Sequence, residues 1–485
     1  MTTLSPAVLC AALVAGFPAA ALAASDADLK QLRDQLRELR ETYQQRIDAL
    51  ERRVAEAEAR SASASSAAAT ATRVATAAAG EAGSAARAVG EVRAVADQAG
   101  SRPASEGAFN PAISLIVDSK FTRLQRDPAN YRIDGFIPSG GEVAPPRKGF
   151  SLGESELALS ANIDHLFRGN ARFSLAEDDG QGVVNVEEVN VETLALPAGL
   201  KLKAGRFLSG VGYLNQQHPH EWDFTDAPLA YKAFFGSRLQ NDGVQLRWVA
   251  PTDLFLEFGT EAASGVKFPG AERKANGAGL WTAFTHLGGD IGDSSAWRVG
   301  LSHVRASPRE RGFETSDVAT GDLHQNSFSG SSQTWIADFI YKWAPDGNST
   351  VTNFKLQGEY LWRRENGDLT YDLGGAAEAV SAARFRQSGG YLQAVYQFMP
   401  QWRVGLRGDW LRSGTADLGT LTSAQLPILA GYDPTRQSAM VDWSPSEFSR
   451  LRLQFARDKS RDGAPDNQVW LQYVMSLGAH GAHKF

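Results

Sequence analysis

Apolar and polar residues alternate with a period of two through most of the chain, from residue 109 to residue 485. In the segment QTWIADFIYKWA, Trp335, Phe339 and Trp343 fall on one face, and Asp338 and Lys342 fall on the other. Consecutive side chains of a β-strand point to opposite faces, so the pattern predicts strands. About sixteen such segments recur, each bounded by Gly, Pro, Asn or Asp. They begin near Ala112, Ser151, Arg168, Val183, Gly199, Asp242, Asp253, Asn276, Ser295, Thr334, Val351, Gly389, Gln401, Gln437, Glu447 and Gln468.

The connections between these segments alternate between short and long. The short ones are 165–169, 196–199, 250–253, 288–295, 344–350, 399–402 and 444–447. The long ones are 125–149, 209–240, 262–275, 306–332, 366–388 and 414–436. Tight turns at one end of a sheet and long loops at the other are typical of bacterial outer-membrane barrels. The sequence therefore predicts an all-β fold, a transmembrane antiparallel β-barrel of about 16 strands that occupies 109–485.

The first 24 residues have the pattern of a secretory signal peptide, with an apolar stretch from Ala7 to Ala23 before a small-residue cleavage site. The single cysteine, Cys10, lies inside this signal, which excludes a disulfide framework and a thiolate metal site in the mature chain. No later run reaches the ~18 apolar residues of a spanning helix, so a membrane location requires a closed barrel.

The sequence predicts a periplasmic coiled coil at residues 25–60, before the barrel. Leu29, Leu32, Leu36, Leu39 and Tyr43 repeat at steps of three and four, which is the seam of a coiled coil, and Arg and Glu flank them. A single amphipathic helix lying on another domain is the alternative. Residues 61–108 are rich in Ala and Ser and predict a low-complexity spacer.

The last predicted strand ends close to the C-terminus. Leu471, Tyr473 and Leu477 share one face of this segment, and Gln472 lies on the other. A terminal Phe485 after such a strand resembles the C-terminal signal that the outer-membrane assembly machinery reads. The predicted location is the outer membrane of a Gram-negative bacterium, with the N-terminal region in the periplasm and membrane lipid around the barrel.

Charge and motifs narrow the function classes. A formal net charge of -6 argues against nucleic acid as a partner. The chain contains no H-E-x-x-H helix, P-loop or dinucleotide-binding glycine motif. One G-x-S-x-G match, GFSLG at 149–153, precedes an alternating strand instead of the helix that a nucleophile elbow requires. We therefore expect no enzyme activity and no cofactor.

Three stretches of the barrel region resemble a known family. They are FSLGESELALSANI, VEEVNVETLALPAGLKLKAGRFL and, after a long loop, LQNDGVQLRWVA. Their order and texture resemble the phosphate-selective porin O and P family. The resemblance covers roughly 109–485 and implies a trimeric, sixteen-stranded channel whose third long loop folds into the lumen. In this chain that loop is 209–240.

Basic residues are in excess on the face that the alternation directs inward. The predicted pore-lining residues are Lys201, Lys203, Arg247, Arg298, Lys355, Arg403, Arg407, Arg450 and Arg452. Tyr231, Lys232 and Arg238 of loop 209–240 are the predicted constriction residues. Because a ladder of fixed basic charges selects anions, the channel is expected to prefer anions, phosphate among them. Interleaved acids on the same face leave cross-strand pairing open as an alternative.

Two histidine clusters are candidate metal sites. His218, His220 and Glu221 lie close together in loop 209–240, and His480 and His483 lie in the C-terminal tail. Imidazole and carboxylate groups bind Zn²⁺, although polar residues of a loop often only satisfy its own turns. The predicted function is passive diffusion of small hydrophilic solutes or ions through an outer-membrane porin. The alternatives are a zinc-acquisition channel and a tether from the outer membrane to the cell wall.

Overall fold

The computed structural model describes residues 111–140, 143–178, 181–271, 276–316 and 321–478. The predicted signal peptide, coiled coil and spacer lie outside the described residues, as do His480, His483 and Phe485. In the described part of the chain, no helix combines the length and the apolar content needed to cross a membrane.

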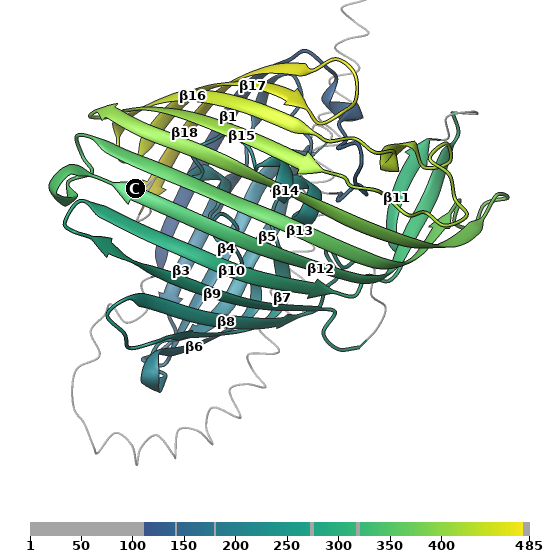
Figure 1. The fold of residues 1–485 in the computed structure, drawn as a ribbon. Helices are drawn as coiled ribbons and strands as arrows, with labels where there is room; N and C mark the ends of the chain where they lie inside the picture. Colours follow the sequence, from purple (N-terminus) through teal and green to yellow (C-terminus); the bar gives the residue numbers. More distant parts are fainter. Residues whose placement is uncertain (1–110, 141–142, 179–180, 272–275, 317–320, 479–485) are drawn as a thin grey trace, which may run out of the picture. The chain divides into compact units, whose positions relative to one another are not determined.

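The described chain forms one closed antiparallel sheet, a β-barrel (Figure 1). Strands that follow one another in the chain pair with each other, and β1 pairs with β18, which closes the sheet. β2 and β3 pair with successive parts of β1, and β11 pairs with the far end of β12, so the barrel wall has 16 strands, as the alternation predicts. The strands are β1 (Ala112–Leu124), β2 (Gly149–Leu152), β3 (Ser155–Asn162), β4 (Phe167–Asp178), β5 (Gln181–Thr193), β6 (Leu200–Leu208), β7 (Gln240–Val249), β8 (Phe255–Ala263), β9 (Leu280–Ile291), β10 (Ser295–Ala306), β11 (Arg311–Ser316), β12 (Leu323–Trp343), β13 (Asn353–Tyr371), β14 (Ala379–Met399), β15 (Trp402–Arg412), β16 (Thr435–Ser446), β17 (Ser449–Lys459) and β18 (Asp466–Gly478).

Helical segments occur only in the connections of the described residues. The one α-helix described, α2 (Leu229–Phe235), lies in loop 209–240 and ends at Gly236, which adopts a left-handed backbone conformation with φ 65°. Glycine is favoured there because it has no β-carbon to clash. The 3-10 turns are η2 (Pro128–Asn130), η3 (Pro197–Gly199), η4 (Pro219–Glu221), η5 (Pro345–Gly347) and η6 (Pro427–Leu429).

The two faces of the wall differ in polarity. In β18, Leu471, Tyr473 and Leu477 are exposed on the outside, whereas Gln472 and Ser476 are buried on the inside. This is the division of faces that the sequence predicts for this strand. An apolar outer face and a polar inner face suit a barrel with lipid outside and water inside.

Two of the predicted long connections are wrong. Residues 306–332 and 366–388 are largely strand, because β12, β13 and β14 continue past the rest of the barrel, where β11 joins them (Figure 1). Their inward side chains, among them Phe328, Leu369 and Phe385, form a second apolar core with η6. Gly330 and Gly367 face each other across this extension. Glycine and small polar residues weaken the apolar alternation there, so the sequence resembles a loop.

The outer face provides a test of the membrane placement. Leu406 is 67% exposed midway along β15, on the side predicted to contact lipid. Leu406→Arg should lower the free energy of unfolding by about 2–4 kcal/mol in a bilayer, because a charged group on the lipid side loses its hydration. Urea titration in lipid vesicles measures this value. Leu406→Ala is the matched control, because it keeps the site apolar. Equal stability of the two variants would contradict lipid contact at this face.

Candidate functional site

Loop 209–240 folds into the barrel and packs against one side of the wall. The loop contributes Trp222, Leu229, Tyr231, Phe234 and Phe235 to a buried apolar cluster. The facing wall residues of this cluster are Phe284 of β9, Val304 of β10, Ile336 of β12, Leu361 of β13, Tyr391 of β14 and Leu411 of β15. The inner wall from β9 to β15 is therefore partly apolar, and the loop covers it.

Two loop carboxylates anchor this packing. Asp223 lies 2.6 Å from Lys355 Nζ and 3.4 Å from Arg403 Nη1. Asp226 pairs with Arg407, at 3.0 Å.

Asp226 is surrounded by further cations. It also pairs with the guanidinium of Arg436 on β16, and Lys232 Nζ lies 3.4 Å away. Burial raises the pKa of Asp226, but the charges of Arg436, Arg407 and Lys232 outweigh that effect and hold the pKa far below its usual value. The carboxylate is thus ionised at neutral pH and holds three cations at one point of the loop.

Several predicted pore-lining residues lie beneath the loop. Arg407, Arg450 and Arg452 are buried against the wall. Arg450 donates to the backbone carbonyl of His220 at 2.5 Å, and Arg452 pairs with Asp442 at 3.1 Å. Arg407 and Arg450 therefore hold the loop to the wall, whereas the pair of Arg452 and Asp442 joins two wall strands.

Two of the predicted constriction residues are also buried. Tyr231 donates its hydroxyl proton to Glu359 at 2.8 Å, and Lys232 lies beside Asp226. Leu214 adds a backbone N–H to the same Glu359 at 2.8 Å. Arg238, the third, bridges Glu154 and Glu187 of the opposite wall, at 2.5 and 2.9 Å.

The other side of the loop borders an open space. A cavity of about 210 Å³ lies between the loop and strands β4 to β7. Its charged lining residues are Arg172, Lys203, Arg247, Glu188 and Glu221, with His218 beside them. Lys203 and Arg247 are among the predicted pore-lining residues, and the structure places both on the lining of this cavity.

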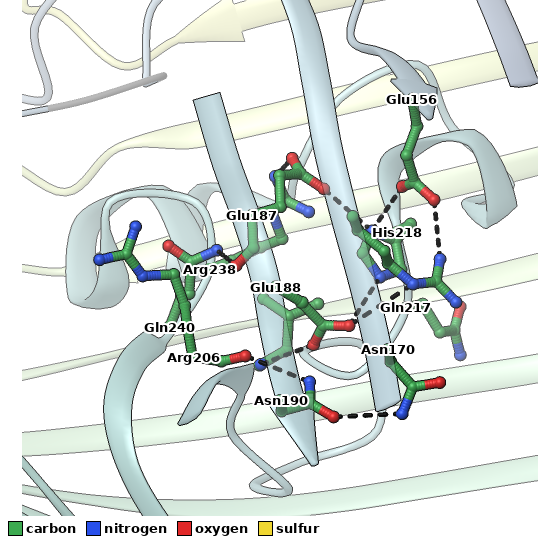
Figure 2. Close-up of polar contacts among 12 residues, drawn as sticks. Glu156, Asn170, Glu187, Glu188, Asn190, Arg206, Gln217, His218, Arg238 and Gln240 are labelled. Atoms are coloured by element: carbon green, nitrogen blue, oxygen red, sulfur yellow. Dashed lines mark hydrogen bonds and ion pairs between the residues drawn. The ribbon is translucent and has the colours of Figure 1, made fainter. Parts of the chain in front are cut away.

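His218 belongs to the loop and lines this cavity. Figure 2 shows its side chain among those of Glu156, Glu187 and Glu188. Its Nδ1 atom lies 2.8 Å from Glu156 Oε2 and 3.2 Å from Glu187 Oε2, and its Nε2 atom lies 3.6 Å from Glu188 Oε2. The ring of His220 stacks against that of His218, with centroids 5.9 Å apart.

A β-bulge creates the acidic side of this cluster. The register of β4 and β5 shifts between Arg172 and Phe173, where Glu188 pairs with Arg172 and Val186 pairs with Phe173. Glu187 is the extra residue, so Glu187 and Glu188 both contact His218. Sequence reasoning missed Glu187, because strict alternation directs one of two adjacent residues outward. The repeated acids in VEEV were the available signal.

The predicted metal set is only partly brought together. Glu156, Glu187 and His218 place their ligand atoms within 4.8 Å of one another. Glu221 instead accepts a hydrogen bond from the backbone N–H of His218, at 3.2 Å. Burial lowers the pKa of His218, but hydrogen bonds to Glu156, Glu187 and Glu188 outweigh that and raise it well above its usual value. This shift favours the protonated imidazole, whose proton a bound cation would have to displace.

A closed barrel with an apolar outer face, a charged lumen and an inward-folded loop has the architecture of an outer-membrane β-barrel of the porin type. No family model matches the chain, so membership of the phosphate-selective family stays a prediction. A protein of Aquifex aeolicus (strain VF5), described only as an uncharacterized protein, is 29% identical over 412 residues, which cover 79% of this chain and 81% of the relative.

Solved structures with a similar outline include outer-membrane channels. The channel DcaP of Acinetobacter baumannii is 12% identical with a TM-score of 0.44, and the alignment covers 77% of this chain and 99% of that one. An anion-selective porin from Comamonas acidovorans is 11% identical with a TM-score of 0.44, covering 76% and 99%. Likenesses at this level indicate nothing about solute or selectivity.

The anchor at Asp226 yields a stability prediction. Asp226→Asn leaves Arg407 and Arg436 without their loop counter-charge and should cost about 3–5 kcal/mol in free energy of unfolding. Because the folded pKa of Asp226 is depressed, this stabilisation is present above about pH 4 and is lost as pH falls towards the folded pKa.

Urea titration at pH 7 measures this cost. Asp433→Asn is the matched control, because Asp433 pairs with Arg412 at 2.6 Å with both side chains exposed. An exposed pair is worth about 0–1 kcal/mol. A loss at Asp226 no larger than that at Asp433 would show that the loop is not held by this carboxylate.

Proposed function

We propose that the protein is an outer-membrane channel through which small hydrophilic solutes diffuse passively, with a preference for anions. The lumen holds no motif for nucleotide binding in its described residues, so movement follows the concentration gradient. Loop 209–240 narrows the path from one side, and the charges of β4 to β7 line the other. Fixed charges in a narrow, low-dielectric lumen set ion preference through their local field.

The anion preference is inferred from which partner of each ion pair is the more exposed to water. Lys201 pairs with Glu192 at 3.0 Å, and the lysine side chain is 43% exposed against 14% for the acid. The side chain of Arg247 is 25% exposed, and that of its partner Glu257 is 3% exposed.

The same order recurs on β10 and β12. The side chain of Arg298 is 20% exposed and that of its partner Asp338 is fully buried. In the pairs of Lys201 and Arg247 the basic group is the more exposed partner. Arg298 also donates to the backbone carbonyl of Gly212, so it lies against loop 209–240. The water-accessible wall around β6 and β7 therefore presents more basic than acidic surface.

Phosphate is the finer proposal for the preferred anion. Arginine forks match phosphate oxygens through paired hydrogen bonds, and Arg172 and Arg247 both line the cavity. The resemblance to the phosphate-selective family supports the same solute and a homotrimer. The location in the outer membrane of a Gram-negative bacterium, with assembly through Phe485, belongs to this proposal too.

The zero-current potential of the purified protein in a planar bilayer under a KCl gradient tests the selectivity. The wild type should give an anion-selective potential, and Lys201→Glu with Lys203→Glu should move it towards cation selectivity, because two inward-facing basic groups become acidic. Lys148→Glu with Arg309→Glu is the charge-matched control, since both residues are exposed in connections. A cation-selective wild type would overturn the anion preference.

Zinc acquisition is the second candidate function, and the cluster of Glu156, Glu187 and His218 favours it. Zn²⁺ takes imidazole and carboxylate ligands in this combination. Micromolar Zn²⁺ should then alter single-channel conductance reversibly, and His218→Gln should remove the effect. His324→Gln is the control, because His324 also pairs with a carboxylate, Asp372, at 2.8 Å. Conductance that responds to Zn²⁺ equally in both variants would exclude this cluster. The tether rests on the coiled coil, outside the described residues, and stays a prediction.

A further inference from the structure

Arginines form a row on the outer face of the barrel, beyond its aromatic residues. Arg305 of β10 lies opposite Gln333 of β12, Gln333 lies opposite Arg364 of β13, and Arg364 lies opposite Arg386 of β14. Arg384 lies two residues before Arg386 on β14. We call Arg305, Arg364, Arg384 and Arg386 the arginine row. All four are exposed.

The neighbouring residues fix the depth of this row. An aromatic set lies two positions closer to the middle of the wall than the arginine row. His303 of β10 lies opposite Trp335 of β12, and Trp335 lies opposite Trp362 of β13. The ring centroids of His303 and Trp335 are 4.4 Å apart, and those of Trp335 and Trp362 are 6.4 Å apart. Aromatic belts mark the membrane–water interface. The arginine row therefore lies at the level of the lipid headgroups.

The guanidinium groups of this row have no ion-pair partner among the described residues. Arg412, at the end of β15, contrasts with them, because it pairs with Asp433. Arg364 of β13 and Arg386 of β14 also lie directly opposite each other on neighbouring strands. Like charges at directly opposite positions destabilise a sheet. An anion between them would relieve this repulsion.

A surface cavity of about 520 Å³ adjoins the row at Arg305. Trp281, His303 and Thr260 also line it. Trp281 lies directly opposite Arg305 in the β9–β10 pair and is 55% exposed. This cavity thus combines an apolar wall with a cation, which suits a molecule that has an acyl part and an anionic head.

We propose that the arginine row binds the phosphate groups of a phosphorylated lipid of the outer leaflet. Arginine holds phosphate through paired, charge-assisted hydrogen bonds. The aromatic residues beneath the row would contact the first part of the acyl chains. The proposal rests on the outer-membrane placement in the proposed function, with the long connections outside, and it does not depend on channel activity.

A solute of the lumen is not the ligand of this row. The arginine side chains lie on the opposite face of the wall from the buried, inward residues Thr334, Arg363 and Gln387. Inorganic phosphate shares the chemistry of the headgroup but has no acyl chain to contact Trp335 and Trp362. The experiment therefore compares a phosphorylated lipid with phosphate alone.

Native mass spectrometry of the full-length protein in detergent tests the proposal with diphosphorylated lipid A as the probe. The wild type should retain lipid A, and Arg364→Gln with Arg386→Gln should weaken its binding at least roughly tenfold, because two charge-assisted contacts are lost. Arg457→Gln with Lys459→Gln is the matched control, since both residues are exposed on one strand, β17, away from the tryptophans. The control should bind as the wild type does.

Two further arms identify the source of the phosphate. Dephosphorylated lipid A should bind poorly, and inorganic phosphate at the same concentration should not displace lipid A. Unchanged lipid A binding by the Arg364 and Arg386 variant, equal binding of the dephosphorylated lipid, or displacement by inorganic phosphate would each overturn the proposal. A change of oligomeric mass in that variant, with lipid binding intact, would overturn it in favour of a subunit contact. Heat-modifiable migration on gels verifies that each variant is folded.

Discussion

The architecture of the lumen depends on one buried carboxylate. Asp226 lies in the loop between β6 and β7, yet it contacts Arg407 of β15 and Arg436 of β16, and Lys232 of α2 lies beside it. A loop that crosses a water-filled barrel loses conformational entropy and needs strong, directional contacts to stay in place. Paired and hydrogen-bonded buried charges provide such contacts, and losing one partner leaves the others uncompensated. The apolar packing of α2 against β9 to β15 then adds the area that the ion pairs alone would not bury.

This anchoring divides the lumen into two unequal sides. The side from β9 to β16 is filled by the loop, so its arginines are structural. On the side from β4 to β7 a cavity remains, and Arg172, Lys203 and Arg247 line it. The same residue type therefore has two roles inside one barrel, and what separates them is whether loop 209–240 covers them. Selectivity in such a channel follows from which partner of each ion pair is exposed, and less from the total count of charges.

The barrel could be predicted from the sequence because strand alternation is a local property. β1, β10 and β15 begin within a residue of the expected positions. The extension of β12 to β14 could not be predicted. Gly330, Gly367 and small polar residues interrupt the apolar alternation there, and the extension packs on a core to which η6 contributes. The roles of the lumen residues depend on distant contacts, such as that of Arg450 with the carbonyl of His220, and no spacing in the chain shows them. Glu187 lies in the site because a bulge in β5 interrupts the alternation from which the inward and outward faces of a strand are predicted.

Thiol accessibility tests the divided lumen most directly. Cys10 is the chain's single cysteine, so a Cys10→Ser background carries no other thiol. Introduced cysteines at Ala230, in the buried helix, and at Lys201, on the open wall, are compared for their rates of reaction with a charged, membrane-impermeant thiol reagent. The account predicts rapid modification of the Lys201→Cys variant and protection of the Ala230→Cys variant until urea unfolds the protein. Equal rates at the two positions in the folded barrel would contradict a loop that is held against the wall.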